Sequence, residues 1–364
     1  MKKLYNYFSK NKLNLYILLI GISIFLILTS VVYYNNNLKG VDKTRYDNAT
    51  KITFKDENFE KAIRKVIEKS KGDIYDIDVK DIGTLDLNLS EIENIEGIEY
   101  FISLESLNIS NNQISDIKPL INLTYLKKIS LNGNNIVYLD GIENLENLTY
   151  LDASKNFIND ISMLSDLKGL IELKLMRNNI SNTDSLKELP NLKILDISNN
   201  RINNISNIVK MTGLTNLNLS TNAIINIDGI ENMVNLLELK INNNGIQNIQ
   251  SLEKLEYLQI LEISHNNIEN LMFVQNNKYL QYLNISYNGI KDIEVIKDLD
   301  DLEKLSLRYT NVTDISGLLE LESLNEIYLD DHVNREPIKE MKNRFKSADI
   351  VTKEFFVNAI YNDK

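Results

Sequence analysis

The chain has 364 residues, and its 40 Lys and Arg against 51 Asp and Glu give a net charge of −11. An acidic balance of this kind argues against a protein built to bind nucleic-acid phosphates. The absence of cysteine excludes disulfides, thiolate metal sites and a cysteine nucleophile, and two histidines supply little acid–base or metal chemistry.

An uncharged apolar run lies near the N-terminus, at residues 15–34, LYILLIGISIFLILTSVVYY. As a helix it spans about 30 Å, the thickness of a bilayer core. A cleavable signal peptide has a shorter apolar stretch and a small-residue cleavage site. We therefore expect a cytoplasmic basic tail (1–14), an uncleaved transmembrane signal anchor (15–34) and a spacer (35–47). Removal of the segment as a signal peptide is the alternative, and both interpretations export the rest of the chain.

Hydrophobic residues recur with a period of 22 beyond the spacer. Steps of 22 from Leu85 give leucine or isoleucine at every position up to Ile327, and steps from Leu104 give leucine at every position up to Leu324. Self-similarity at such a fixed period is typical of a solenoid, in which each repeat contacts only its neighbours. The period therefore predicts one repeat array rather than two or three globular domains.

Two spacings alternate within each repeat. Leu107 and Ile109 are two residues apart, as inward-facing positions of a strand must be. Ile114, Ile117 and Leu120 follow at intervals of three, which matches a 3₁₀ path better than an α-helix. Each repeat is therefore predicted to be a short strand, a turn and a tightly coiled return.

An asparagine column marks the end of each predicted strand. A buried turn leaves backbone N–H and C=O groups that need partners, and an amide side chain supplies both donors and an acceptor. We interpret the column as a structural ladder, formed by Asn112, Asn134, Asn156, Asn178, Asn200, Asn222, Asn244, Asn266 and Asn288.

The repeat L-x-x-L-x-L-x-x-N-x-I-x-x-I-x-x-L-x-x-L resembles the 22-residue leucine-rich repeat of bacterial internalins, as in residues 112–126, NQISDIKPLINLTYL. Residues 52–67, ITFKDENFEKAIRKVI, resemble the N-terminal cap of exported leucine-rich repeat proteins of Gram-positive bacteria. The resemblance implies an α/β solenoid, a horseshoe with a parallel β-sheet on its concave face and a 3₁₀ or irregular convex side. Its expected parts are an N-terminal helical cap (48–84), the repeats (85–329) and a C-terminal cap (330–364).

One departure from the family bears on function. Internalins that bind host receptors usually continue into an immunoglobulin-like domain and a cell-wall attachment region. Here we expect only a helix and a strand within residues 335–356 after the array. The departure favours a membrane-tethered recognition protein over a host-invasion factor.

Two groups of side chains stand out on the predicted concave face, where proteins of this kind usually bind. Twelve strands at about 4.8 Å would give that face an arc of about 50 Å. Tyrosine and arginine are enriched at binding hot spots, and the first group, the tyrosine patch, comprises Tyr282, Tyr287, Arg308, Tyr309 and Tyr328. The second group, the basic patch, comprises Lys128, Tyr150, Lys155, Lys174, Met176 and Arg177. Ordinary solvated side chains are the competing interpretation of both groups.

Motifs for catalysis are absent from the sequence. It contains no G-x-S-x-G, H-E-x-x-H, phosphate-binding or dinucleotide-binding glycine motif. Glu262, Ser264 and His265 are close in sequence, but no oxyanion donor or pocket is implied there. We therefore expect neither an enzyme nor a bound cofactor or metal.

The sequence thus predicts a single-pass cell-membrane protein of a Gram-positive bacterium with an extracellular repeat domain. Its expected role is protein–protein recognition through the concave face, with a partner on the cell envelope or on a neighbouring or host cell. No nucleic-acid or small-molecule substrate is expected. Two alternatives stay open: a secreted internalin-like adhesin or virulence factor released after signal cleavage, and a module that binds a cell-wall polymer.

Overall fold

The computed structural model describes residues 46, 48–330, 332–334, 336–337, 340 and 349–352. The predicted anchor at residues 15–34 lies outside these residues. Among the helices that are described, none is both long and apolar enough to span a bilayer. The chain divides into two compact units, one formed by Met1–Ile52 and Asp73–Asp78, the other by Thr53–Gly72 and Val79–Lys364.

The described part of the first unit is held together by a short antiparallel contact. Lys51 forms a bridge with Tyr75, and the Ile52 N–H donates to the Ile74 carbonyl at 2.9 Å. The ring of Tyr46 packs on that of Tyr75 with centroids 4.8 Å apart. The one-turn helix α4, Asp76–Val79, follows this contact along the chain.

The N-terminal helix of the second unit is α3, Glu57–Val66, which confirms the predicted helical cap. It buries Phe59 and caps its start with Asp56, whose Oδ1 accepts from the Phe59 N–H at 2.9 Å. The other oxygen of Asp56 accepts from the N–H groups of Glu93 and Asn94 in the first repeat, at 2.6 and 3.1 Å. Burial raises the pKa of this carboxyl, but the backbone donors outweigh it and hold the pKa below its usual value.

The repeats form one parallel sheet in chain order, which confirms the predicted solenoid. Leu85 lies opposite Leu107, and the same offset of 22 holds through Leu305 and Ile327. β13 pairs in parallel with β12, within the segment where we expected the strand of a C-terminal cap. The strands are β1 (Thr84–Asp86), β2 (Ser106–Asn108), β3 (Lys128–Ser130), β4 (Tyr150–Asp152), β5 (Glu172–Lys174), β6 (Ile194–Asp196), β7 (Asn216–Asn218), β8 (Glu238–Lys240), β9 (Ile260–Glu262), β10 (Tyr282–Asn284), β11 (Lys304–Ser306), β12 (Glu326–Leu329) and β13 (Asp349–Thr352).

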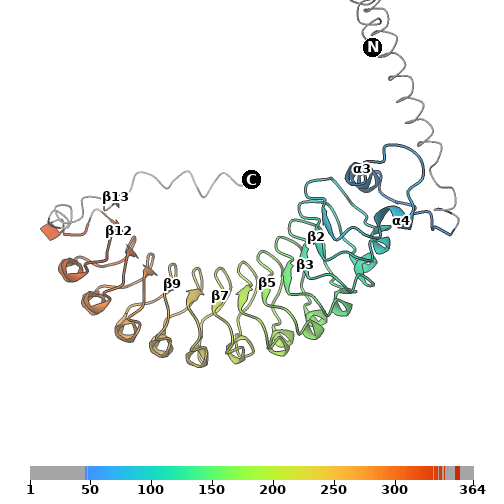
Figure 1. The fold of residues 1–364 in the computed structure, drawn as a ribbon. Helices are drawn as coiled ribbons and strands as arrows, with labels where there is room; N and C mark the ends of the chain where they lie inside the picture. Colours follow the sequence, from blue (N-terminus) through green and yellow to red (C-terminus); the bar gives the residue numbers. More distant parts are fainter. Residues whose placement is uncertain are drawn as a thin grey trace, which may run out of the picture. The chain divides into compact units, whose positions relative to one another are not determined.

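Short 3₁₀ helices return the chain along the convex side of the array, while the strands line its concave side (Figure 1). Many of them begin beside an Asn or Asp; Asp160, for example, accepts from the Ser162 N–H at 2.9 Å. This second polar column was not singled out from the sequence. The helices are η2 (Ile98–Tyr100), η3 (Lys118–Leu120), η4 (Ile142–Asn144), η5 (Ser162–Asp166), η6 (Asp184–Glu188), η7 (Ile208–Lys210), η8 (Ile230–Asn232), η9 (Gln250–Lys254), η10 (Met272–Asn276), η11 (Glu294–Asp298) and η12 (Ser316–Glu320).

The asparagine column joins each repeat to the one before it. The Asn178 amide donates to the carbonyl oxygens of Leu175, in its own repeat, and Ala153, in the preceding one, both at 3.0 Å. Its Oδ1 accepts from the Ile158 N–H, also at 3.0 Å. All nine asparagines bond in this way, so each closes its own turn and cross-links two coils.

Asn277 is a polar exception in the core, because leucine stands at the equivalent positions, Leu255 and Leu299. Its side chain is fully buried, and its amide donates to the carbonyl oxygens of Leu252 (3.2 Å) and Leu255 (2.8 Å). Within the described part of the chain, its Oδ1 accepts no hydrogen bond. A buried acceptor without a donor costs about 1 to 3 kcal/mol.

We therefore expect Asn277→Leu to raise the free energy of unfolding by about 1 kcal/mol, measured by urea denaturation. The two carbonyls lose little, because they keep the backbone donors of Leu255 and Leu258 at 3.0 and 3.1 Å. Leu299→Asn, the reverse change one repeat later, should destabilise the array. A lower stability for Asn277→Leu would contradict the explanation.

Candidate protein-binding surface

A row of residues with left-handed backbone follows the strands, four positions after each strand leucine. Its non-glycine members have φ between +51° and +56°, a region that costs most L-residues about 1 to 2 kcal/mol. The conformation is held because each N–H donates to the next repeat, as Arg177 does to the Ser198 carbonyl at 3.0 Å. The left-handed row comprises Leu89, Asn111, Gly133, Lys155, Arg177, Asn199, Thr221, Asn243, His265, Tyr287 and Tyr309.

Three aromatic rings stack at the C-terminal end of the left-handed row. The centroids of His265 and Tyr287 are 3.8 Å apart, and those of Tyr287 and Tyr309 are 4.2 Å apart. Tyr287 and Tyr309 nevertheless remain 42% and 47% exposed. Burial lowers the pKa of His265, which favours the neutral imidazole in the stack.

A second aromatic group lies on the sheet beside this stack. The Lys304 ammonium is 5.3 Å from the ring centroid of Tyr282 and 5.2 Å from that of Tyr328. It also pairs with Glu326 at 2.9 Å, and the Tyr328 hydroxyl donates to the same carboxylate. Burial lowers the pKa of Lys304, but Glu326 and Tyr328 outweigh it and raise the pKa above its usual value. The cation therefore holds the two rings in a fixed arrangement.

The predicted tyrosine patch thus forms two adjoining groups. Tyr287 and Tyr309 belong to the left-handed row, whereas Tyr282 and Tyr328 lie on the strands. Arg308 joins them, because its guanidinium lies 5.5 Å from the ring centroid of Tyr328. The sequence prediction missed His265, Lys304 and Glu326. His265 could have been included, because it stands one period of 22 before Tyr287.

The predicted basic patch carries less free charge than the sequence suggests. The Lys174 ammonium pairs with Glu172 at 2.7 Å and lies 5.4 Å from the ring centroid of Tyr150. The hydrogen bond with Glu172 raises the pKa of Lys174, while burial raises that of Tyr150. Met176 is half-buried, whereas three cations are exposed and form no ion pair among the described residues: Lys128, Lys155 and Arg177.

The residues considered for catalysis have structural partners instead. The Ser264 hydroxyl donates to Asn242 Oδ1 at 3.0 Å, and His265 is stacked on Tyr287. Among the described residues, no group of three or more histidines and carboxylates could hold a metal ion.

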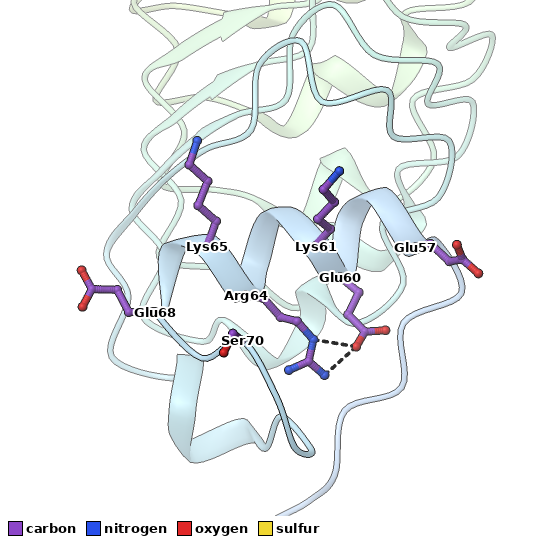
Figure 2. Close-up of a pocket in the computed structure, with 7 residues that line it drawn as sticks. All are labelled: Glu57, Glu60, Lys61, Arg64, Lys65, Glu68 and Ser70. Atoms are coloured by element: carbon purple, nitrogen blue, oxygen red, sulfur yellow. Dashed lines mark hydrogen bonds and ion pairs between the residues drawn. The ribbon is translucent and has the colours of Figure 1, made fainter.

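A hollow of about 580 Å³ lies along α3, lined by Glu57, Glu60, Lys61, Arg64, Lys65, Glu68 and Ser70 (Figure 2). The Arg64 guanidinium there pairs with Glu60 and donates to the carbonyl oxygens of Lys69 and Gly72. The arginine is thus used in holding the end of α3 to the loop that follows it.

Comparisons with known proteins agree with this geometry. The family model described as Leucine Rich repeats (2 copies) matches residues 102–146, 190–232 and 280–320. The crystal structure of an internalin, InlF, from Listeria monocytogenes is similar at a TM-score of 0.76 and 30% identity, over 82% of this chain and 88% of that one. A comparison with curated protein sequences gives no significant match.

Two further structures share the fold at lower identity. The functional domain of InlJ from Listeria monocytogenes has a TM-score of 0.57 and 22% identity, over 76% of this chain and 55% of that one. A leucine-rich repeat protein of Leptospira interrogans has a TM-score of 0.58 and 20% identity, over 76% and 84%. The fold and the repeats define a leucine-rich repeat protein. Within that class, the chain belongs to the internalin-like proteins.

Proposed function

We propose that this chain is a membrane-tethered, extracellular recognition protein that binds another protein and carries out no catalysis. The observation that carries the proposal is the aromatic stack at the end of the left-handed row, with Tyr287 and Tyr309 about half exposed. Rigid aromatic side chains contribute large contact area at binding hot spots and lose little conformational entropy on binding. Leucine-rich repeat scaffolds typically bind proteins, which agrees with this surface.

Site-specific photo-cross-linking on intact cells tests protein recognition. A benzophenone amino acid replaces Tyr287 in the full chain, and a matched variant carries it at Tyr125, which is 64% exposed and outside the row. The same protein adduct should form from position 287 and not from 125, as identified by mass spectrometry. Adducts that contain only carbohydrate would favour a cell-wall polymer and overturn the proposal.

The membrane tether rests on the apolar run at residues 15–34. Cell fractionation with an antibody against the repeats tests it. The tethered form should sediment with membranes and retain residues 1–34. Recovery only from the medium, with those residues removed, would support the secreted adhesin instead.

A further inference from the structure

Charge compensation on the strands and the left-handed row is uneven. Three of the lysines on the strands are each held by a carboxylate on the same or the next strand. Their Nζ to Oε distances are 2.7 to 2.9 Å, in the pairs Lys174–Glu172, Lys240–Glu238 and Lys304–Glu326. Because these ammonium groups are already paired within the chain, they contribute little electrostatic attraction to a binding partner.

Lys155 and Arg177 behave differently. They are consecutive members of the left-handed row, both exposed, with φ of +55°. The Lys155 N–H donates to the Met176 carbonyl at 2.7 Å, so the backbone keeps the two positions one repeat apart. In the described part of the chain, neither side chain has a carboxylate within ion-pair distance. Like charges held side by side repel, and an anion bound between them would relieve that repulsion.

We propose that Lys155 and Arg177 bind carboxylates of an acidic segment in the protein partner. The inference rests on the proposed function and adds the partner's chemistry to it. Arginine binds a carboxylate through two parallel hydrogen bonds, which gives direction as well as charge. The partner's acidic segment lies against the middle of the row, and its apolar contact lies at the aromatic end.

The part of the row between the two cations and the aromatic stack suits an extended segment. Arg177 and His265 are four repeats apart, or about 19 Å at the spacing of parallel strands. The positions between them carry small polar side chains that can bond a peptide backbone: Asn199, Thr221 and Asn243. An acidic protein segment fits better than a long polyanion, because the chain's net charge of −11 repels a polymer of like charge.

Fluorescence anisotropy of the full chain in detergent micelles tests the proposal with a labelled (Glu-Gly)₄ peptide at low ionic strength. Binding should exceed that of (Gln-Gly)₄, weaken with added salt, and fall about tenfold or more in Lys155→Glu/Arg177→Glu. The control Lys168→Glu/Lys187→Glu alters net charge equally, but its lysines lie outside the row and near Glu188 at 3.9 and 4.0 Å. The control should bind as the wild type does.

Three results would overturn the inference: equal losses in the two reversed variants, equal binding of the two peptides, or displacement of (Glu-Gly)₄ by poly(glycerol phosphate) at lower charge concentration. Equal losses would mean that net charge alone determines binding, and equal binding of the two peptides would mean that the site does not recognise charge. Displacement by the polymer would mean that the site prefers an anionic polymer to an acidic peptide. A failure of the proposed function is distinguishable from a failure of this inference. It would appear as the absence of a protein adduct in the photo-cross-linking experiment on cells, which the peptide assay does not measure.

Discussion

Replacing Asn178 by alanine is expected to lower the free energy of unfolding by about 3 kcal/mol or more. The change removes two hydrogen bonds to the carbonyl oxygens of Ala153 and Leu175 and one from the Ile158 N–H, all at 3.0 Å. The Ala153 and Leu175 carbonyls keep one donor each, the amides of Asn156 and Asn200 at 3.1 and 3.0 Å. The buried Ile158 N–H loses its acceptor, which costs about 1 to 3 kcal/mol in addition to the two lost hydrogen bonds. Because stability in a repeat array is a sum of nearest-neighbour terms, the loss falls on the junction of two coils.

Urea denaturation followed by circular dichroism measures this loss. Asn203→Ala is the matched control, because Asn203 is exposed and lies outside the column. Asn178→Asp separates the two roles of the amide: it retains the acceptor but loses the donor, and should therefore also destabilise. If Asn178→Ala and Asn203→Ala have equal stabilities, the ladder does not hold the coils together.

Tyr287→Ala combined with Tyr309→Ala should weaken binding of the cross-linked protein partner by roughly a hundredfold, since hot-spot truncations cost about 2 kcal/mol or more each and are not additive. Both rings are about half exposed, so their removal leaves the buried leucine columns unchanged. Circular dichroism should show an intact fold, and surface plasmon resonance against the identified partner measures the affinity.

A second tyrosine pair supplies the control for this prediction. Tyr257 and Tyr279 also stack, with centroids 6.0 Å apart, and are 57% and 52% exposed. They lie outside the left-handed row, in the segments that lead into the next strands. Tyr257→Ala with Tyr279→Ala should leave the affinity unchanged, whereas an equal loss from both pairs would mean that the aromatic row has no special role.

Features that recur in every repeat can be predicted from the sequence alone. A period of 22 without insertion determines which strand lies beside which and in what register, because Leu85 and Leu107 must share one core. The structural role of the asparagine column can also be predicted from the sequence, because the column recurs in every turn and its hydrogen-bond partners are backbone groups. The membrane anchor remains a prediction, because residues 15–34 lie outside the described residues.

The sequence by itself therefore determined the solenoid, its concave strands and its internal ladder, because these depend on repeated local patterns. Only the tertiary structure decided which exposed charges are available. Lys174 is neutralised by Glu172 at 2.7 Å, whereas Lys155 and Arg177 have no such partner among the described residues. Likewise, the stacking of His265 on Tyr287 depends on a left-handed backbone that backbone hydrogen bonds to the next repeat hold in place. Pairing and stacking between repeats depend on side-chain geometry, which a period alone does not encode.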